Sequence, residues 1–264
     1  MKTKTNFLIC FVVILLFLGP NTQSVAAQSQ VSLPIQLKVN DFYILYTSPA
    51  PPFVDQKGRM LIPLKAVEDL LGGKVTYNAM NKTATIDLLG RSIEVTIGTR
   101  DILINSESVT MDTVPVMKEN TMFLPVSVLV KDTDAKMEWD AQRGLLKLNH
   151  ESFNKSQVLL SFLGQDLAEV TNKEAFDLHS YEWNAAGNLT IHADFDKGLK
   201  FSEKQVDIHP LLMYGKTYTM DPYSRPVSVK TIQLSGEGQL TFKRDFRNDL
   251  EKVRYIIAVG RLTK

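Results

Sequence analysis

The sequence predicts an α+β protein: a tandem-repeat module of short antiparallel strands with one helix per repeat, followed by a β-rich, sandwich-like domain. Two apolar blocks occur twice with one spacing of 62 residues, since residues 61–64 return at 123–126 and residues 75–78 return at 137–140. A spacing shared by separate blocks indicates a duplicated structural unit. Later in the chain this register stops, and short alternating segments separated by Gly, Pro and Asn are typical of a β-sandwich.

The N-terminus has the pattern of a secretory signal peptide over residues 1–27. Lys2 and Lys4 precede an apolar run at 7–18, and Val-Ala-Ala at 25–27 supplies the small residues that a signal peptidase reads. The apolar run is shorter than the about 20 residues that cross a bilayer. We therefore expect cleavage, secretion and an extracellular protein associated with the cell wall of a Gram-positive bacterium; the alternative is a retained N-terminal anchor.

The composition indicates what stabilises the fold and which class of partner the chain does not bind. The single cysteine, Cys10, lies within the predicted signal peptide, so the secreted chain forms no disulfide and depends on burial. Lys and Arg number 30 against 29 Asp and Glu, which gives a net charge of +1. A balanced charge does not supply the basic surface that nucleic acid requires. We expect no nucleic acid partner and no membrane span after cleavage, and the oligomeric state stays open.

The first repeat, at about 37–97, follows a polar leader at 28–36 that we expect to be flexible. It opens with a strand and a Pro-rich loop, where the missing N–H groups prevent regular structure. A short strand then ends at Pro63. Apolar residues at i, i+3, i+6 and i+7 from Leu64 predict an amphipathic helix, which Gly72 caps. Alternating strands complete the repeat.

The second repeat, at about 98–149, follows the same order. A strand that ends at Pro125 leads directly into a second helix. Asp-Thr-Asp at 132–134 replaces the glycine cap, so we expect this helix to be shorter or irregular. A hairpin with strands at 136–139 and 144–148 closes the unit.

Several short motifs of the first repeat return in the second. In the first copy they are a Val-Asn strand end (39–40), a polar turn (57–59), a Pro block (61–65), a Leu-Gly helix end (71–72) and an aromatic strand (75–78). The second copy has an Ile-Asn strand end (104–105), a polar turn (120–121), a Pro block (123–126) and an aromatic strand (137–140), but not the Leu-Gly helix end. In this pattern, residues 37–149 resemble the copper amine oxidase N-terminal-like domain, or stalk domain, of secreted bacterial proteins. Lys65 stands where that family has arginine, and we expect it to pair with a carboxylate; the second copy has Ser127 there. The resemblance implies a non-catalytic α+β module that serves as a stalk, a spacer or a wall-associated binding unit.

Residues 150–264 form the predicted β-rich domain, to which the sequence assigns no role. The apolar segment 158–163 is a buried strand or part of a helix, because periodicity does not separate the two. Alternating patterns predict strands at 188–195, 227–234, 239–242 and 253–259.

Residues that would carry catalysis or hold a metal do not converge in the sequence. None of the four histidines lies two or four positions from another. His192 and Asp194 share one strand face, as two metal ligands would, but a solvated pair on an exposed face is the favoured explanation. The chain has no Gly-x-Ser-x-Gly elbow, and the secreted chain has no cysteine. We therefore predict no catalytic residue, no metal, no cofactor and no enzymatic activity.

Exposed aromatic rings stack on sugars, so aromatic residues are the candidate ligand contacts. Three of them flank the Pro-rich loop and two alternate on a strand of the second domain: Phe42, Tyr43, Tyr46, Tyr181 and Trp183. Loops on a rigid scaffold often carry function, and core packing is the alternative for all five. Tyr77 and Trp139 occupy the repeated position, so we expect both in the core.

These observations predict a secreted, non-catalytic cell-envelope protein that acts as a binding or spacer module for cell-wall polysaccharide or another envelope protein. One alternative is a hydrolase of envelope polymers with its site in 150–264, which predicts a deep pocket with converging ionisable groups. Another is a peptide-binding sensory or regulatory ectodomain, which predicts an exposed, uncharged strand edge. A glycan binder predicts a shallow, aromatic-lined surface.

Overall fold

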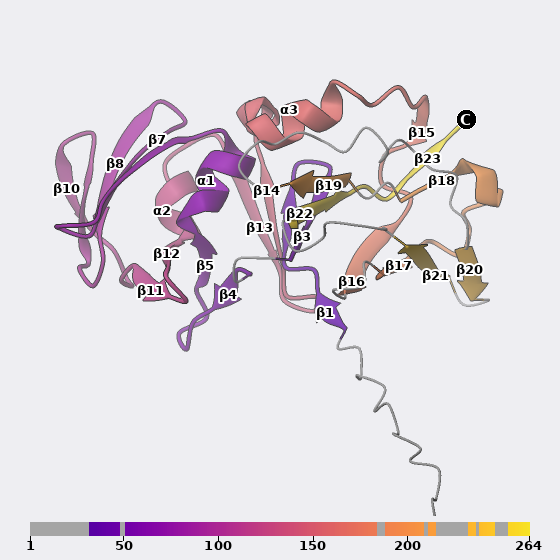
Figure 1. Ribbon diagram of the computed structural model, residues 1–264, viewed down its shortest axis with the longest axis horizontal. Helices are drawn as coiled ribbons and strands as arrows, with labels where there is room; N and C mark the ends of the chain where they lie inside the picture. Colours follow the sequence, from indigo (N-terminus) through magenta and orange to yellow (C-terminus); the bar gives the residue numbers. More distant parts are fainter. Residues whose placement is uncertain are drawn as a thin grey trace, which may run out of the picture.

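The fold is strand-rich with few helices (Figure 1). The computed structural model describes residues 32–47, 51–183, 188–208, 211–214, 232–235, 238–245 and 253–264. The predicted signal peptide lies outside these ranges, as do residues 227–231 of one predicted strand. Among the described residues, no helix has the length and apolar character needed to cross a membrane.

A six-stranded central sheet organises the described structure. Its strands, in spatial order, are β13 (Lys136–Asp140), β14 (Leu145–Asn149), β2 (Leu37–Val39), β3 (Phe42–Tyr46), β22 (Val253–Ala258) and β19 (Leu211–Tyr214). The pairing of β14 with β2 is parallel, whereas the other pairings are antiparallel. Strands from both sides of residue 150 therefore share one sheet, and the division of the chain into domains stays a prediction.

The central sheet is buried on both faces, because successive side chains of a strand point to opposite sides. Ile44 and Tyr255 pack into a first core, which also contains the buried faces of α1 (Leu64–Leu71) and α3 (Gln157–Leu163). Leu45 and Ile256 pack into a second core on the other side. In Figure 1 the central sheet accordingly lies between strands β7, β8 and β10 on one side and β16, β17, β20 and β21 on the other.

Two smaller sheets complete the first core. One, here the N-side sheet, has the order β10 (Glu107–Thr110), β9 (Asp101–Ile104), β8 (Arg91–Thr96), β7 (Thr83–Leu88) and β6 (Lys74–Asn78). The other, here the proline sheet, has the order β11 (Val116–Lys118), β12 (Thr121–Pro125), β5 (Met60–Pro63) and β4 (Phe53–Val54). In the proline sheet β5 and β12 pair directly, with Ile62 opposite Leu124.

Each of these two paired strands ends in a proline from which a helix starts. The helix after Pro63 is α1, and Gly72 ends it with a left-handed φ of 71°. The helix after Pro125 is α2 (Val126–Val130), which has five residues against eight in α1. The second helix is therefore shorter, as expected, and its cap residue Lys131 (φ −58°, ψ 139°) does not take the left-handed conformation of Gly72.

Two further sheets enclose the second core. The C-side sheet has the order β1 (Leu33–Pro34), β16 (Asp177–Trp183), β17 (Asn188–Asp194), β21 (Gln239–Asp245) and β20 (Ile232–Ser235). The terminal sheet has the order β15 (Val170–Asn172), β23 (Arg261–Thr263) and β18 (Val206–Asp207). Short 3₁₀ turns, η1 (Glu151–Lys155) and η2 (Glu203–Gln205), lie in the connections.

The structure changes one expectation and decides between two alternatives for another segment. The leader is not free from Leu33 onward, because β1 pairs with β16 and the side chain of Ile35 is buried in the second core. The apolar segment 158–163 belongs to helix α3. Its N-terminus is defined by the Ser156 side chain, which accepts a hydrogen bond from the backbone N–H of Leu159.

Candidate functional site

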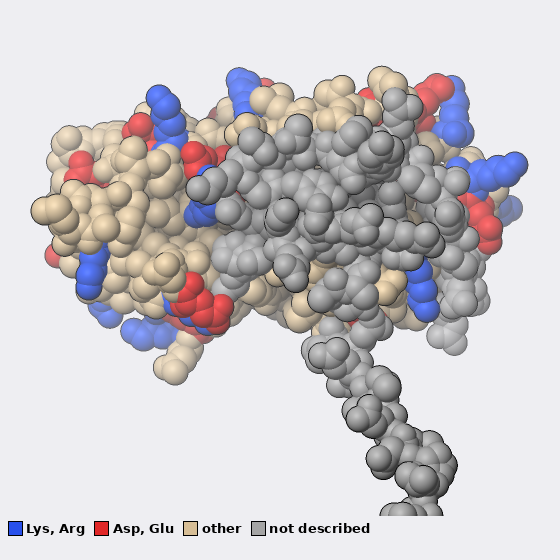
Figure 2. Space-filling view, in the orientation of Figure 1, with Lys and Arg blue, Asp and Glu red and all other residues tan. Residues whose placement is uncertain are grey.

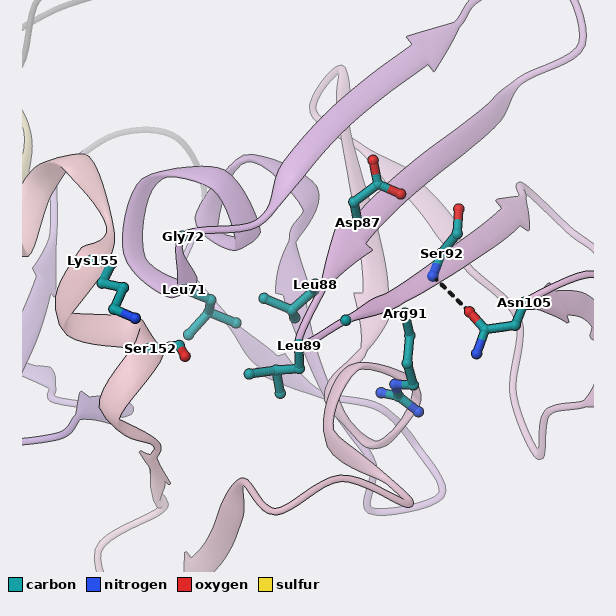
Figure 3. Close-up of a pocket in the computed structure, with 11 residues that line it drawn as sticks. Leu71, Gly72, Asp87, Leu88, Leu89, Arg91, Ser92, Asn105, Ser152 and Lys155 are labelled. Atoms are coloured by element: carbon teal, nitrogen blue, oxygen red, sulfur yellow. Dashed lines mark hydrogen bonds between the residues drawn. The ribbon is translucent and has the colours of Figure 1, made fainter.

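An open pocket of about 560 Å³ lies where the end of α1, the β7–β8 turn and η1 meet. Leu71, Leu88 and Leu89 form its apolar wall, and Figure 3 shows them between Lys155 on one side and Arg91 on the other. The β7–β8 turn consists of Leu89 and Gly90, both with positive φ (51° and 72°). Two positive φ values match the tight hairpin turn that fits the twist of the flanking strands.

Arg91 follows this turn and is fixed by the end of a helix. Its Nη1 donates to the carbonyl oxygen of Lys131 at 2.7 Å, and its Nη2 donates to that of Leu129 at 2.6 Å. These carbonyls close α2, where no further helical N–H is available to them. Burial lowers the pKa of Arg91, which nearby Asp132 partly opposes. Within the described part of the chain, Arg91 has no carboxylate in an ion pair, and its buried Nε–H has no hydrogen-bond partner.

Asn105 contributes an amide to the same pocket. It lies in the turn between β9 and β10 with a φ of 50°, a conformation that asparagine tolerates better than most residues. Its Oδ1 accepts a hydrogen bond from the backbone N–H of Ser92 at 3.0 Å, drawn dashed in Figure 3. The two N–H groups of this amide are therefore left for another acceptor.

The remaining polar groups come from η1 and β7. Lys155 and Ser152 line the pocket from η1, and Asp87 lines it from β7. Lys155 is exposed and forms no ion pair with any described residue. The polar lining is thus rich in hydrogen-bond donors, with one carboxylate among them.

The aromatic residues predicted as ligand contacts lie largely in the two cores. Phe42, Tyr43, Tyr46 and Tyr181 are each at most 6% exposed, and Trp183 is partly buried against the second core. The Phe42 ring packs on that of Phe162 at 4.8 Å, and the Tyr46 ring packs on that of Tyr255 at 5.1 Å. Rings packed in this way offer no face to a sugar, so core packing, the alternative weighed for these residues, describes their placement.

Tyr77 and Trp139, which were expected to be buried, are partly exposed. The Tyr77 side chain is 41% exposed and the Trp139 side chain is 44% exposed. Tyr77 lies on β6 and Trp139 on β13, and each of these strands is at the edge of its sheet. Their side chains point to the core side of the sheet, in register with the buried Ala84 and Leu146, but at the edge of the sheet they stay partly exposed.

The histidines of the C-side sheet pair with carboxylates. His192 Nε2 lies 3.5 Å from Glu182 Oε1, and His179 Nε2 lies 3.8 Å from Asp194 Oδ1. Burial lowers the pKa of His179. No group of three or more His, Cys, Asp or Glu side chains among the described residues is arranged to hold a metal ion. The absence of a metal and of a cofactor stays a prediction.

Charge is mixed on the described part of the surface. Figure 2 shows Lys and Arg interspersed with Asp and Glu on the visible face. Lys65 lies 3.0 Å from the carboxylate of Asp69 and also pairs with Glu68, so the expected pairing takes place within α1.

The sequence indicates only some of the elements that form the pocket. Two turns are readable from the sequence: Leu-Gly between two alternating segments, and Asn105 followed by Ser106. Nothing in the local pattern indicates that η1 approaches these turns from elsewhere in the chain. The approach depends on Gly72, where an added Cβ would lie 3.3 Å from the backbone nitrogen of Ser156.

Comparison with known proteins gives a family match for part of the chain. No curated protein and no solved structure matches the chain at a significant level. Residues 38–148, less than half of the 264 residues, match the model of the copper amine oxidase N-terminal domain family. This domain is a non-catalytic, stalk-like domain, and the match contains every residue that lines the pocket except those of η1. The segment 38–148 is therefore similar to the copper amine oxidase N-terminal domain, which confirms the resemblance seen in its sequence.

Proposed function

We propose that the protein is a secreted, non-catalytic cell-envelope protein that acts as a binding or spacer module for cell-wall polysaccharide or a protein partner. The stalk-like family of segment 38–148 supports a binding or spacing role. The signal peptide pattern at 1–27 supports secretion.

One observation carries the binding role: the open pocket whose donors are left without partners. Arg91 Nε, the Asn105 amide and the Lys155 ammonium all lie there without a protein acceptor in the described structure. The buried Nε–H of Arg91 is a donor that is costly to leave without an acceptor, so it indicates a place where a ligand supplies one. Asn105 and Lys155 are exposed, and they add donors that such a ligand can reach.

We further propose that segment 37–149 arose by tandem duplication, with one helix per repeat. The pairing of β5 with β12, and the start of α1 and α2 directly after prolines 62 residues apart, support this origin. Superposition of 37–97 on 98–149 tests it, and two halves with different strand order would contradict it.

The binding role is tested by retention of the chain 28–264 on purified cell-wall material, with and without its anionic polymers. We expect retention on the wall and no release of soluble sugar or peptide. Release of fragments by pure protein would instead support the hydrolase alternative. Absence of retention together with capture of an envelope protein would support the protein-partner form of the proposal, and absence of both would reject it.

A further inference from the structure

We propose that the pocket at the β7–β8 turn binds the anionic group of an acidic polysaccharide, a carboxylate or a phosphate, between Arg91, Asn105 and Lys155. This inference rests on the proposed binding role and names the chemistry of its ligand.

Arg91 is the fixed cation of the pocket. Three carbonyl oxygens at the end of α2, those of Val128, Leu129 and Lys131, orient its guanidinium group. These contacts leave the buried Nε–H without a partner, and no described carboxylate pairs with the charge. A cation taken partly out of water without a counter-ion is costly, and an incoming anion reduces that cost. Because its position is already set, little entropy is lost when the anion binds.

Two further donors come from separate elements. The amide of Asn105 is held by its bond to the backbone of Ser92, which directs its N–H groups away from β8 (Figure 3). Lys155 reaches the pocket from η1, on the far side of the leucine wall. A strand, a turn and a 3₁₀ turn thus supply donors to one concavity. A concave surface lined with donors and unpaired cations favours a negative charge.

The rest of the lining selects a hydroxylated ligand over a bare anion. Leu71, Leu88 and Leu89 offer an apolar surface to the C–H groups of a sugar ring. Asp87 is exposed at the pocket and forms no ion pair with a described residue, so it is able to accept hydrogen bonds from hydroxyl groups. The open form of the pocket admits an internal unit of a polymer. These features together fit an acidic sugar or a phosphate-linked polyol.

The test compares three soluble polymers by isothermal titration with the chain 28–264: polygalacturonate for carboxylate, poly(glycerol phosphate) for phosphate, and dextran as the neutral reference. We expect at least one acidic polymer to bind about tenfold or more tightly than dextran, with affinity falling as salt is raised. Binding of the first polymer alone assigns a carboxylate, and binding of the second alone assigns a phosphate. Equal binding of all three overturns the proposal.

Two substitutions locate the site. Asn105→Asp keeps the oxygen that accepts from Ser92 but replaces the amide donor by a negative charge, and Lys155→Gln removes an exposed charge without loss of an ion pair. We expect each to weaken binding of the acidic polymer by roughly tenfold, since a hydrogen bond to a charged group is lost. Lys204→Gln removes an exposed charge in η2 and serves as the matched control, with unchanged binding.

The outcomes separate this inference from the proposed function. If the unchanged chain is retained on cell wall but the Asn105 and Lys155 variants are retained equally well, the binding role stands and the anion pocket is rejected. If the chain binds neither wall nor any polymer, both are rejected. Weakened binding in these two variants, with unfolding curves that match the unchanged chain, supports the pocket.

Discussion

The hydroxyl group of Tyr181 joins the C-side sheet to the central sheet, since it donates to the carbonyl oxygen of Tyr46 at 2.6 Å in a buried position. Burial raises the pKa of Tyr181 to about 12 from its ordinary 10.0. The folded chain therefore keeps this proton at pH values where the unfolded chain loses it. The stability that results is complete below pH 10 and is lost as pH rises toward 12. We predict that Tyr181→Phe lowers the free energy of unfolding at pH 7 by about 1 kcal/mol and makes its fall above pH 10 less steep.

Urea unfolding at pH 7, 9 and 11 measures this effect. Tyr77→Phe is the control, because Tyr77 is exposed at the edge strand β6 and is expected to leave the profile unchanged. A Tyr181→Phe profile parallel to that of the unchanged chain would show that Tyr181 does not contribute to the alkaline loss of stability.

Gly260 is the residue at which the chain turns from β22 into β23. A Cβ built there overlaps the carbonyl oxygen of Phe176, and it also comes within 2.7 Å of a methyl group of Leu178. The backbone contact leaves no room for relaxation, because the N–H of Phe176 donates to the carbonyl of Gly260 at 3.0 Å. We predict that Gly260→Ala destabilises the fold by about 3 kcal/mol, measured by thermal unfolding. A change within the error of the measurement would contradict this close approach.

At the scale of elements, the end of α1 depends on Gly72 for two reasons. Its φ of 71° is left-handed, and its Cα faces the backbone of Ser156 at the start of α3. Gly58 has a similar φ of 77° but has no atom within 4 Å of a built Cβ. We therefore predict that Gly58→Ala costs only the backbone strain, about 1 kcal/mol, and that Gly72→Ala costs clearly more. Equal losses in urea unfolding would show that the contact with α3 relaxes freely.

Local elements were predictable where the signal is local. Pro63 and Gly72 marked both ends of α1, and the alternation at 188–195 marked β17, because turn chemistry and side-chain period are properties of neighbouring residues. The placement of Tyr77 and Trp139 was not predictable in the same way. Their alternation indicated the correct side of the sheet, but the sequence does not state which strand is at an edge, and only strand order decides whether a core-facing ring is covered.

The same distinction applies to the site. The turns that bear Leu89 and Asn105 were readable, whereas the approach of η1 and the capping of α2 by Arg91 depend on contacts between distant parts of the chain. The burial of two residues predicted as ligand contacts was not readable for this reason. Phe42 and Tyr46 belong to β3, which lies inside the central sheet between β2 and β22. The nearby Pro-rich loop indicates a surface position for these residues, but the strands that pair with β3 decide their burial, and the local sequence does not identify those strands.

At the scale of the whole molecule, Arg261 connects three segments near the C-terminus. Its guanidinium forms two hydrogen bonds to Asp166 after α3, at 2.6 and 2.7 Å, and one to Asp207 in β18 at 2.7 Å. Its side chain is only 10% exposed, so its loss removes three charge-assisted hydrogen bonds from two carboxylates in a poorly solvated site. We predict that Arg261→Gln costs about 3 kcal/mol. Lys264→Gln breaks an exposed pair with Glu169 and is expected to cost less than 1 kcal/mol.

Segments more than 200 residues apart in the sequence meet in the central sheet, where β22 pairs with β3 from Tyr46 to Tyr43. Removal of residues 253–264 would expose this edge of β3 and would remove Tyr255, Ile256 and Ile257, each fully buried. Two of these side chains belong to the first core and one to the second, so both cores would be opened at once. We predict that a chain ending at residue 252 shows no cooperative thermal transition and binds a dye for exposed apolar surface.

The chain 28–264 is expected to unfold in a single transition observed alike by near- and far-UV circular dichroism. A chain 28–149 that folds cooperatively would show instead that the family-like segment is stable without β22, because its own strands β13, β14, β2 and β3 would then suffice for the sheet.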